Sequence, residues 1–169
     1  MRRLLQVSSA LLAFITPGWA IADPVRADLP PMTFGSAELS VRDSQGKLTV
    51  YRAADLEKLP TYRLTTTTPW RDQPAVFEGV LLSDLLAAHD LQAAGDITVT
   101  AENDFVSLFS PEVLNATPIL VATRVDGRPH SRRARGPFQF VVDADAFEQS
   151  EALEESHLVW MAARIEAGR

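Results

Sequence analysis

The chain has 169 residues, of which 46% are hydrophobic and 22% charged, and its formal net charge is −6. This length suits one domain with a core of its own, and the composition excludes an intrinsically disordered chain. The chain has no Cys, which excludes disulfides, thiolate metal sites and a cysteine nucleophile, and its negative charge argues against a nucleic-acid partner.

The first 22 residues have the layout of a secretory signal peptide. A pair of arginines opens the segment, an apolar stretch follows at 4–15, and Ala20-Ile21-Ala22 supplies a small-residue cleavage site. The apolar stretch is shorter than the ~20 residues that a membrane-spanning helix needs. We therefore expect cleavage after Ala22, export to the periplasm and no membrane insertion of the mature chain. Cleavage takes the formal charge from −6 to −8, because two arginines and no acidic residue are lost.

The elements expected before residue 90 mix strands with short helices. Residues 23–36 contain three prolines and read as an extended N-terminal arm, which precedes a domain at 37–169. The alternation of apolar and polar residues and the positions of turn residues predict the elements. In chain order these are a β-hairpin of 39–41 and 48–51, a helix at 53–59, strands at 62–67 and 76–77, and a helix at 81–89. Ser83 is the expected N-cap of the last helix.

The second half of the chain reads as strands separated by turns. They are expected at 97–101, 106–109, 119–125, 138–142 and 158–165, and a helix is the alternative for the last segment. Asp126-Gly127 is typical of a turn that ends a strand. Together these elements predict an α+β domain with a mixed β-sheet and short helices.

Trp70 follows Pro69 in a polar loop at the end of a predicted strand. Because loops on a rigid scaffold often carry function, this tryptophan is a candidate for stacking on a planar ligand. The alternative is a half-buried tryptophan that closes one end of the sheet.

Two polar segments are further candidates. Asn103 and Asp104 join two strands and are common turn residues, but an amide and a carboxylate there also suit the 2-amino-pyrimidinone edge that a pterin presents. The segment Arg128–Arg135 concentrates arginines in an acidic domain, which predicts an anion site or a wall of donors for ring oxygens and nitrogens. A solvated loop is the alternative. The three histidines lack the spacing of a metal motif, so we expect them at the surface.

Six segments of the chain occur in the order seen in the molybdopterin-binding domain of the sulfite oxidase family. They are residues 65–70, 77–86, 101–105, 118–129, 135–137 and Trp160. The chain resembles this family over about residues 37–166, and it is most similar to small exported members that consist of this domain alone. The resemblance implies the mixed-sheet fold of that family.

The same resemblance exposes a departure at the metal site. Sulfite oxidases carry a cysteine, which ligates molybdenum, on the strand that leads into the loop matched here by Thr66–Trp70. This chain has threonine there. The resemblance therefore implies a non-catalytic periplasmic pterin-binding protein without molybdenum, which regulates cyclic di-GMP signalling through the periplasmic region of a membrane diguanylate cyclase or phosphodiesterase. The alternative is a molybdopterin-dependent oxidoreductase subunit that holds its cofactor without the usual cysteine.

The resemblance also assigns ligand-binding roles. Trp70 would stack on the pterin ring, and Asn103 or Asp104 would read its polar edge. Arg132 and Arg135 would donate hydrogen bonds to ring oxygen and nitrogen, or to a side-chain phosphate. Phe105 completes the expected site, at a position where relatives often have tyrosine. No catalytic residue and no metal ligand is expected.

Overall fold

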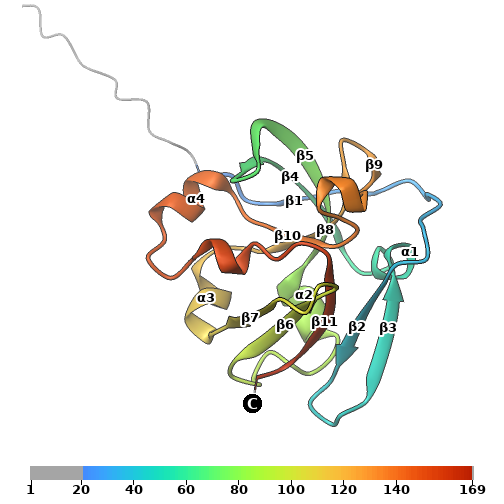
Figure 1. Cartoon of the computed structure of the whole chain (residues 1–169), viewed down its shortest axis with the longest axis vertical. Coiled ribbons are helices and arrows are strands. Elements are labelled where there is room, and N and C mark those ends of the chain that lie inside the picture. The colour runs from blue at the N-terminus through green and yellow to red at the C-terminus, as the bar shows by residue number, and fades with distance from the viewer. Residues whose placement is uncertain (1–20, 169) are drawn as a thin grey trace, which may run out of the picture.

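A computed structural model describes residues 21–168 and shows two β-sheets, drawn one above the other in Figure 1, with short helices around them. The expected signal peptide lies almost wholly outside the described residues. None of the helices within 21–168 has the length and apolar character needed to cross a membrane. The mixed strands and short helices of the described residues confirm the predicted α+β fold class.

The larger sheet has six strands within the described residues, in the order β1-β4-β5-β8-β10, with β9 paired to β8. All its pairs are antiparallel. Its strands are β1 (Val25–Arg26), β4 (Thr61–Thr68), β5 (Arg71–Leu81), β8 (Leu120–Val125), β9 (Arg128–Pro129) and β10 (Gln139–Val141).

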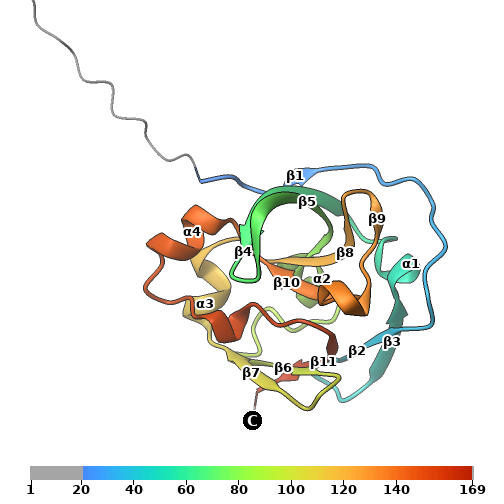
Figure 2. The same ribbon diagram turned by 45° about the horizontal axis from the view of Figure 1, so that its top comes forward.

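Strand β5 is much longer than the two residues, 76–77, that the sequence predicted. Its first four residues are polar or proline and exposed, so they give no alternating signal. They still pair with the threonine-rich end of β4, across a register shift between Thr66 and Thr68. The resulting long hairpin curves over the body of the molecule (Figure 2) and carries Trp70 at its tip.

The second sheet has five strands in the described chain, in the order β3-β2-β11-β6-β7. They are β2 (Glu38–Arg42), β3 (Leu48–Arg52), β6 (Ile97–Ala101), β7 (Val106–Phe109) and β11 (Ala162–Ala167). Strand β11 runs parallel to β2 and antiparallel to β6, so the sheet is mixed as predicted. The closing strand begins later than the expected residue 158, because the chain first forms the 3-10 helix η2 (Glu155–His157) and then bends at Met161, whose φ is 52°.

The helices of the described residues are all short. Besides η2, they are α1 (Ala53–Leu56), α2 (Leu82–Ala87), α3 (Pro111–Ala116), α4 (Ala144–Gln149) and the 3-10 helix η1 (Arg132–Ala134). The prediction of Ser83 as an N-cap was wrong: the chain passes from β5 directly into α2, and Leu81 is the N-cap without a side-chain bond. Helices α3 and α4 were not predicted, although Ser110 and Asp143 cap them through their side chains. Six residues are too few to show a helical period.

One apolar core lies between the two sheets. Buried side chains from β2, β5, β6, β8, β10 and β11 meet there, with Phe109, Phe138 and Phe140 among the largest. A smaller cluster on the far side of the larger sheet includes Leu64 and Phe77. This rigid body holds the loops at the end of the β4–β5 hairpin in fixed positions.

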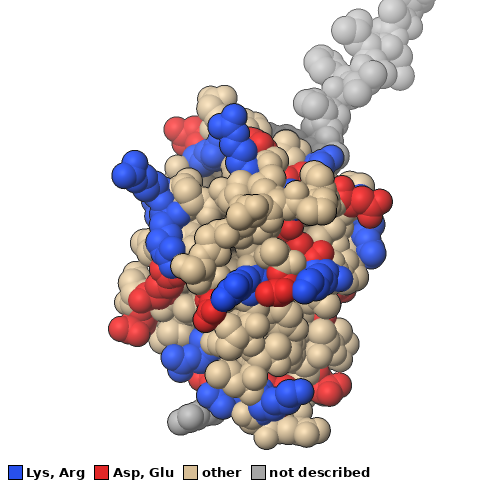
Figure 3. Space-filling model, turned by 90° about the vertical axis from the view of Figure 1, so that its right-hand side faces the viewer, with Lys and Arg blue, Asp and Glu red and all other residues tan. Residues whose placement is uncertain are grey.

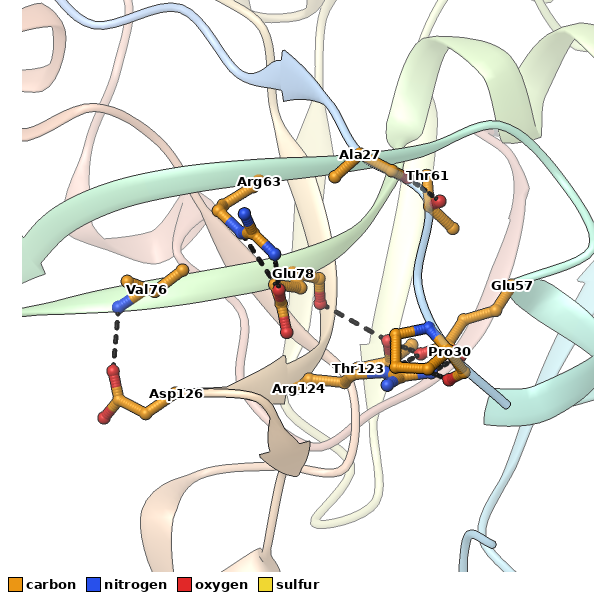
Figure 4. A network of polar contacts seen from close by, with 10 residues as sticks. All are labelled: Ala27, Pro30, Glu57, Thr61, Arg63, Val76, Glu78, Thr123, Arg124 and Asp126. Atoms are coloured by element: carbon orange, nitrogen blue, oxygen red, sulfur yellow. Dashed lines mark hydrogen bonds and ion pairs between the residues drawn. The ribbon is translucent and has the colours of Figure 1, made fainter. Parts of the chain in front are cut away.

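Residues 23–36 run along the larger sheet and are held there by polar contacts (Figure 4). The amide of Ala27 donates to the Thr61 carbonyl at 2.9 Å, and an Nη of Arg124 donates to the Pro30 carbonyl at 2.8 Å. Arg124 is 1% exposed and pairs with Glu57 at 2.6 Å, while the Thr123 hydroxyl also donates to Glu57 at 2.6 Å. A buried ion pair thus links the N-terminal arm, α1 and β8.

Charges on the surface are mixed rather than segregated. Figure 3 shows the face at the right of Figure 1, where β2, β3 and α1 lie, with acidic and basic side chains beside one another. Ion pairs join Arg42 to Glu166 at 3.3 Å and Lys58 to Asp55 at 2.6 Å. Exposed pairs of this kind add little to stability.

Gly79 in β5 should not tolerate a side chain. A Cβ there would overlap the carbonyl oxygen of Val121 in the paired strand β8. We expect Gly79→Ala to lower the free energy of unfolding by about 1–3 kcal/mol, as overpacked sites do. Urea unfolding checks this, with Gly35→Ala as the matched control, because nothing lies within 4 Å of a Cβ at Gly35. Equal unfolding midpoints for the two variants would contradict the close approach of β5 and β8.

Candidate functional site

Trp70 lies in the tight turn Pro69-Trp70 that joins β4 to β5, where Thr68 pairs with Arg71. The loop expected from the sequence is therefore the tip of a long hairpin. The indole is half-buried and packs against the edge of the main core. The tip presents an aromatic ring that is neither fully buried nor free in solvent.

Arg135 reaches Trp70 from the loop that follows β9. The turn η1 ends at Arg135, which has the left-handed φ of 75°. Its guanidinium carbon lies 4.4 Å from the centroid of the Trp70 ring and 5.1 Å from that of Trp160. Both distances are within the ≈ 6 Å range of cation–π attraction. The two tryptophans and the arginine form one cluster from three distant parts of the chain, which we call the Trp–Arg cluster.

Backbone bonds join the three loops around this cluster. The amide of Met161 donates to the carbonyl of Arg135 at 3.2 Å, and the carbonyl of Met161 accepts from the amide of Glu102 at 2.8 Å. The Glu102 carboxylate also binds Arg132 through two hydrogen bonds, at 2.9 and 2.7 Å. The geometry of the site is therefore set by segments near residues 102, 132–135 and 161, not by any one loop.

Two hollows meet at the Trp–Arg cluster, and Trp70 and Trp160 line both of them. The first, of about 390 Å³, is polar and holds several arginines. The second, of about 400 Å³, is less polar and includes Phe105 and Leu158. Each is within the range of small-molecule sites, about 300–1,000 Å³. A larger apolar groove of about 690 Å³ lies elsewhere, between α2 and α3, and no charged residue lines it.

The first hollow is strongly basic. Four arginines line it and no acidic residue of the described chain does so: Arg71, Arg132, Arg133 and Arg135. The bond to Glu102 raises the pKa of Arg132 above its ordinary value. Arg71 pairs with Asp126 at 3.2 Å, whereas Arg133 and Arg135 form no ion pair within residues 21–168. The hollow thus offers guanidinium donors to an anion or to the oxygen and nitrogen atoms of a ring.

The Asn103 turn contributes to the second hollow. Asn103 and Phe105 line this hollow, and Phe105 is 44% exposed. The side-chain oxygen of Asn103 accepts a long bond from the Phe105 amide at 3.4 Å, which leaves the amide nitrogen of Asn103 as a donor. Asp104 has the left-handed φ of 64° and lines neither hollow. The structure therefore brings Trp70, Asn103 and Phe105 together, and Trp70 with Arg132 and Arg135, but it leaves Asp104 outside.

The expectation that the histidines lie at the surface was wrong. His89, His130 and His157 are 7%, 5% and 8% exposed. His89 contacts the Tyr51 hydroxyl at 2.9 Å, and His157 accepts a bond from a backbone amide at 2.9 Å. Burial lowers the pKa of His89 and of His130 below the ordinary value, so their neutral forms are favoured. Each histidine is buried with a hydrogen-bond partner that its position in the sequence did not reveal.

The residues at the end of β4 do not fit a molybdenum centre. The family resemblance places the molybdenum-ligating cysteine in the threonine run at the end of β4, and Thr66 of this run is buried. Its hydroxyl accepts a bond from the Ala144 amide at 2.9 Å and donates to the Thr67 carbonyl at 3.3 Å. No group of three or more metal-binding side chains converges anywhere in residues 21–168. A bonded hydroxyl does not replace the soft thiolate that such a metal centre uses.

The two sheets and their order define a fold of the sulfite oxidase type, as comparison with solved structures shows. The chain is similar to the crystal structure of the sulfane dehydrogenase SoxCD from Paracoccus pantotrophus, with a TM-score of 0.59 and 16% identity. The match covers 80% of this chain but 39% of the SoxCD chain, so the chain spans less than half the length of the chain that it matches. No protein-family model matches the sequence, and no curated protein does so.

Several residues of the site were not singled out from the sequence. Trp160 was seen as part of a family pattern, but nothing local placed it beside Trp70. Arg71 lines the first hollow and Glu102 holds Arg132, while His130 was noted only as a member of the arginine-rich segment and expected at the surface. Of these residues, only Arg71 had a signal in the sequence. A tight turn at Pro69-Trp70 places Arg71 opposite Thr68 in a hairpin.

Proposed function

We propose that this protein is an exported, non-catalytic pterin-binding protein. The observation that carries the proposal is the Trp–Arg cluster, in which the Arg135 guanidinium lies over the rings of Trp70 and Trp160 where two hollows meet. A flat heteroaromatic ring gains from stacking on an indole, and the arginines beside it donate to carbonyl oxygens and ring nitrogens. The sulfite oxidase-type fold supports a pterin as that ring, since this fold is associated with a pterin cofactor.

Within the proposed complex, the parts of the ligand divide between the two hollows. The ring stacks on Trp70 with its pyrimidine edge toward the first hollow, where Arg132, Arg133 and Arg135 donate to its oxygen and ring nitrogens. The amide nitrogen of Asn103 faces the opposite end of the ring, in the second hollow. Asp104 takes no part, because it lines neither hollow.

The proposal assigns no redox reaction to the chain. Molybdenum chemistry in this fold depends on a cysteine thiolate, and the residues at that place are threonines with bonded hydroxyls. The function left to the fold is ligand recognition.

We further propose that pterin binding is read by a membrane protein that makes or degrades cyclic di-GMP, through its periplasmic region. This step rests on the family resemblance alone. It predicts that deleting the gene changes the cellular level of cyclic di-GMP. The wild-type gene should restore the original level, whereas a variant impaired in pterin binding, such as Trp70→Ala, should not. Unchanged levels after deletion would overturn the regulatory role.

The ligand can be tested on the protein as the cell makes it. The full chain is expressed with its leader, purified from the periplasm and denatured, and the released small molecules are examined for pterin fluorescence. Molybdenum is measured in the same sample by mass spectrometry. We expect a pterin in near-stoichiometric amount and no molybdenum. Stoichiometric molybdenum would instead favour an oxidoreductase subunit.

A further inference from the structure

His130 occupies a fixed place at the floor of the first hollow. Its amide donates to the Thr123 carbonyl at 2.8 Å, and its ring meets the Phe77 ring edge-on at 6.3 Å between centroids. Gly136 lies so close that a Cβ there would overlap the His130 backbone and ring. The backbone hydrogen bond, the Phe77 ring and the close approach of Gly136 together fix the position of His130.

The hydrogen bond to Gln139 determines which ring nitrogen carries the proton. His130 Nε2 lies 2.7 Å from Oε1 of Gln139. An amide oxygen only accepts, so Nε2 is the donor and Nδ1 of the neutral ring carries a lone pair. Nδ1 is closed to solvent and has no hydrogen-bond partner among the described residues. A buried acceptor without a partner is rare in folded proteins and asks for an explanation.

The surroundings of His130 favour a neutral acceptor. Burial lowers its pKa, Arg71 of β5 lowers it further, and only the bond to Gln139 of β10 opposes this. The other charged side chains that line the hollow are Arg132, Arg133 and Arg135 of its own loop. Guanidinium groups donate and do not accept. The hollow is thus rich in donors, and His130, which lines it, has an unused acceptor in its buried Nδ1.

We propose that His130 is a specificity-determining residue, whose Nδ1 accepts a hydrogen bond from an N–H group of the bound ring. The inference rests on the proposed function and deepens it. A pterin carries N–H donors on its pyrimidine edge, and a ring without such donors would leave Nδ1 unpaired. Because Nδ1 is closed to solvent, the proposal requires that exposed side chains of the same hollow, such as Arg71, Arg132 and Arg133, shift when the ring binds.

Two substitutions separate the two ring nitrogens. His130→Asn keeps a polar atom near the position of Nδ1 and loses the bond to Gln139, whereas His130→Gln keeps an atom near Nε2 and loses Nδ1. With oxidised biopterin as the probe at pH 7.5, we expect His130→Gln to raise the Kd about three- to tenfold, the effect of one hydrogen bond. His130→Asn should stay within about twofold of wild type on the same basis. A purely structural role predicts the reverse order, and equal values for both variants would also overturn the inference.

The pH dependence of the wild-type protein gives a second, variant-free test. Protonation of Nδ1 removes the acceptor, and burial lowers the pKa of His130, so the Kd for biopterin should stay constant near neutral pH and rise only as pH falls through the pKa of the free protein's imidazole. An NMR titration of His130 locates that pKa, His130→Asn should show no such rise in Kd, and thermal unfolding at each pH confirms that the protein remains folded. A wild-type Kd that stays flat while the NMR signal of His130 titrates would overturn its role and leave pterin binding intact. A wild-type protein that binds no biopterin at all would overturn both proposals.

Discussion

Replacing Trp70 by alanine is expected to weaken biopterin binding by about 5- to 150-fold while the protein stays folded. Stacking of a planar base on an aromatic side chain contributes about 1–3 kcal/mol, which corresponds to about 5- to 150-fold in Kd. The substitution also removes the nearer of the two rings that hold the Arg135 guanidinium, at 4.4 Å. The variant therefore loses the surface on which the ligand stacks and also a contact that positions the Arg135 guanidinium.

The fold should survive this change because Trp70 lies in a hairpin tip and is only half-buried. Isothermal titration calorimetry with biopterin measures the Kd, and circular dichroism reports the fold. Trp70→Phe is the matched control, since it keeps an aromatic ring at the same place and should retain part of the affinity. A Kd for Trp70→Ala equal to that of wild type would show that Trp70 only closes the end of the sheet.

Removing Glu57 is expected to cause the largest loss of stability. Arg124 is 1% exposed and keeps its charge in the variant, because the ordinary pKa of a guanidinium lies far above neutral pH and Glu78 remains nearby. Glu57→Ala would therefore leave a buried charge without its partner, which costs about 3–5 kcal/mol. The N-terminal arm would loosen as well, since Arg124 also donates to the Pro30 carbonyl and stacks 5.4 Å from the Phe34 ring.

Chemical unfolding measures this effect against a control on the same helix. Asp55 in α1 forms an exposed pair with Lys58 at 2.6 Å, and Asp55→Ala should leave the unfolding midpoint almost unchanged. The double variant Glu57→Leu with Arg124→Met should recover most of the lost stability, because apolar replacements of buried pairs are often tolerated. If Glu57→Ala unfolds at the same denaturant concentration as Asp55→Ala, the ion pair does not hold the arm.

The elements that the sequence predicted well are those with local signals. The hairpin of β2 and β3 and the hairpin of β6 and β7 follow from alternating side chains around polar turns. Strand β5 was underestimated, because pairing with β4 continues through residues whose side chains show no alternation. Backbone pairing needs no apolar side chain, so a partner strand can extend a strand beyond its own sequence signal.

The site was only partly predictable, because it is assembled from distant segments. Trp70 and the arginine loop were each recognisable from their own neighbours. Their contact with Trp160 depends on the bend at Met161 and on the order of strands in both sheets, which no local pattern encodes. The unpaired Nδ1 of His130 likewise becomes visible only when Gln139 and Gly136 are placed around it.

The most direct test of pterin binding uses the tryptophans themselves. The chain has three, and Trp19 belongs to the expected leader, so Trp70 and Trp160 are the two that remain in the exported protein. Titration of that protein with oxidised biopterin should quench their fluorescence in a saturable way with one site per chain. Fluorescence that falls only in proportion to the light absorbed by added biopterin, with no saturation, would contradict pterin binding at the Trp–Arg cluster.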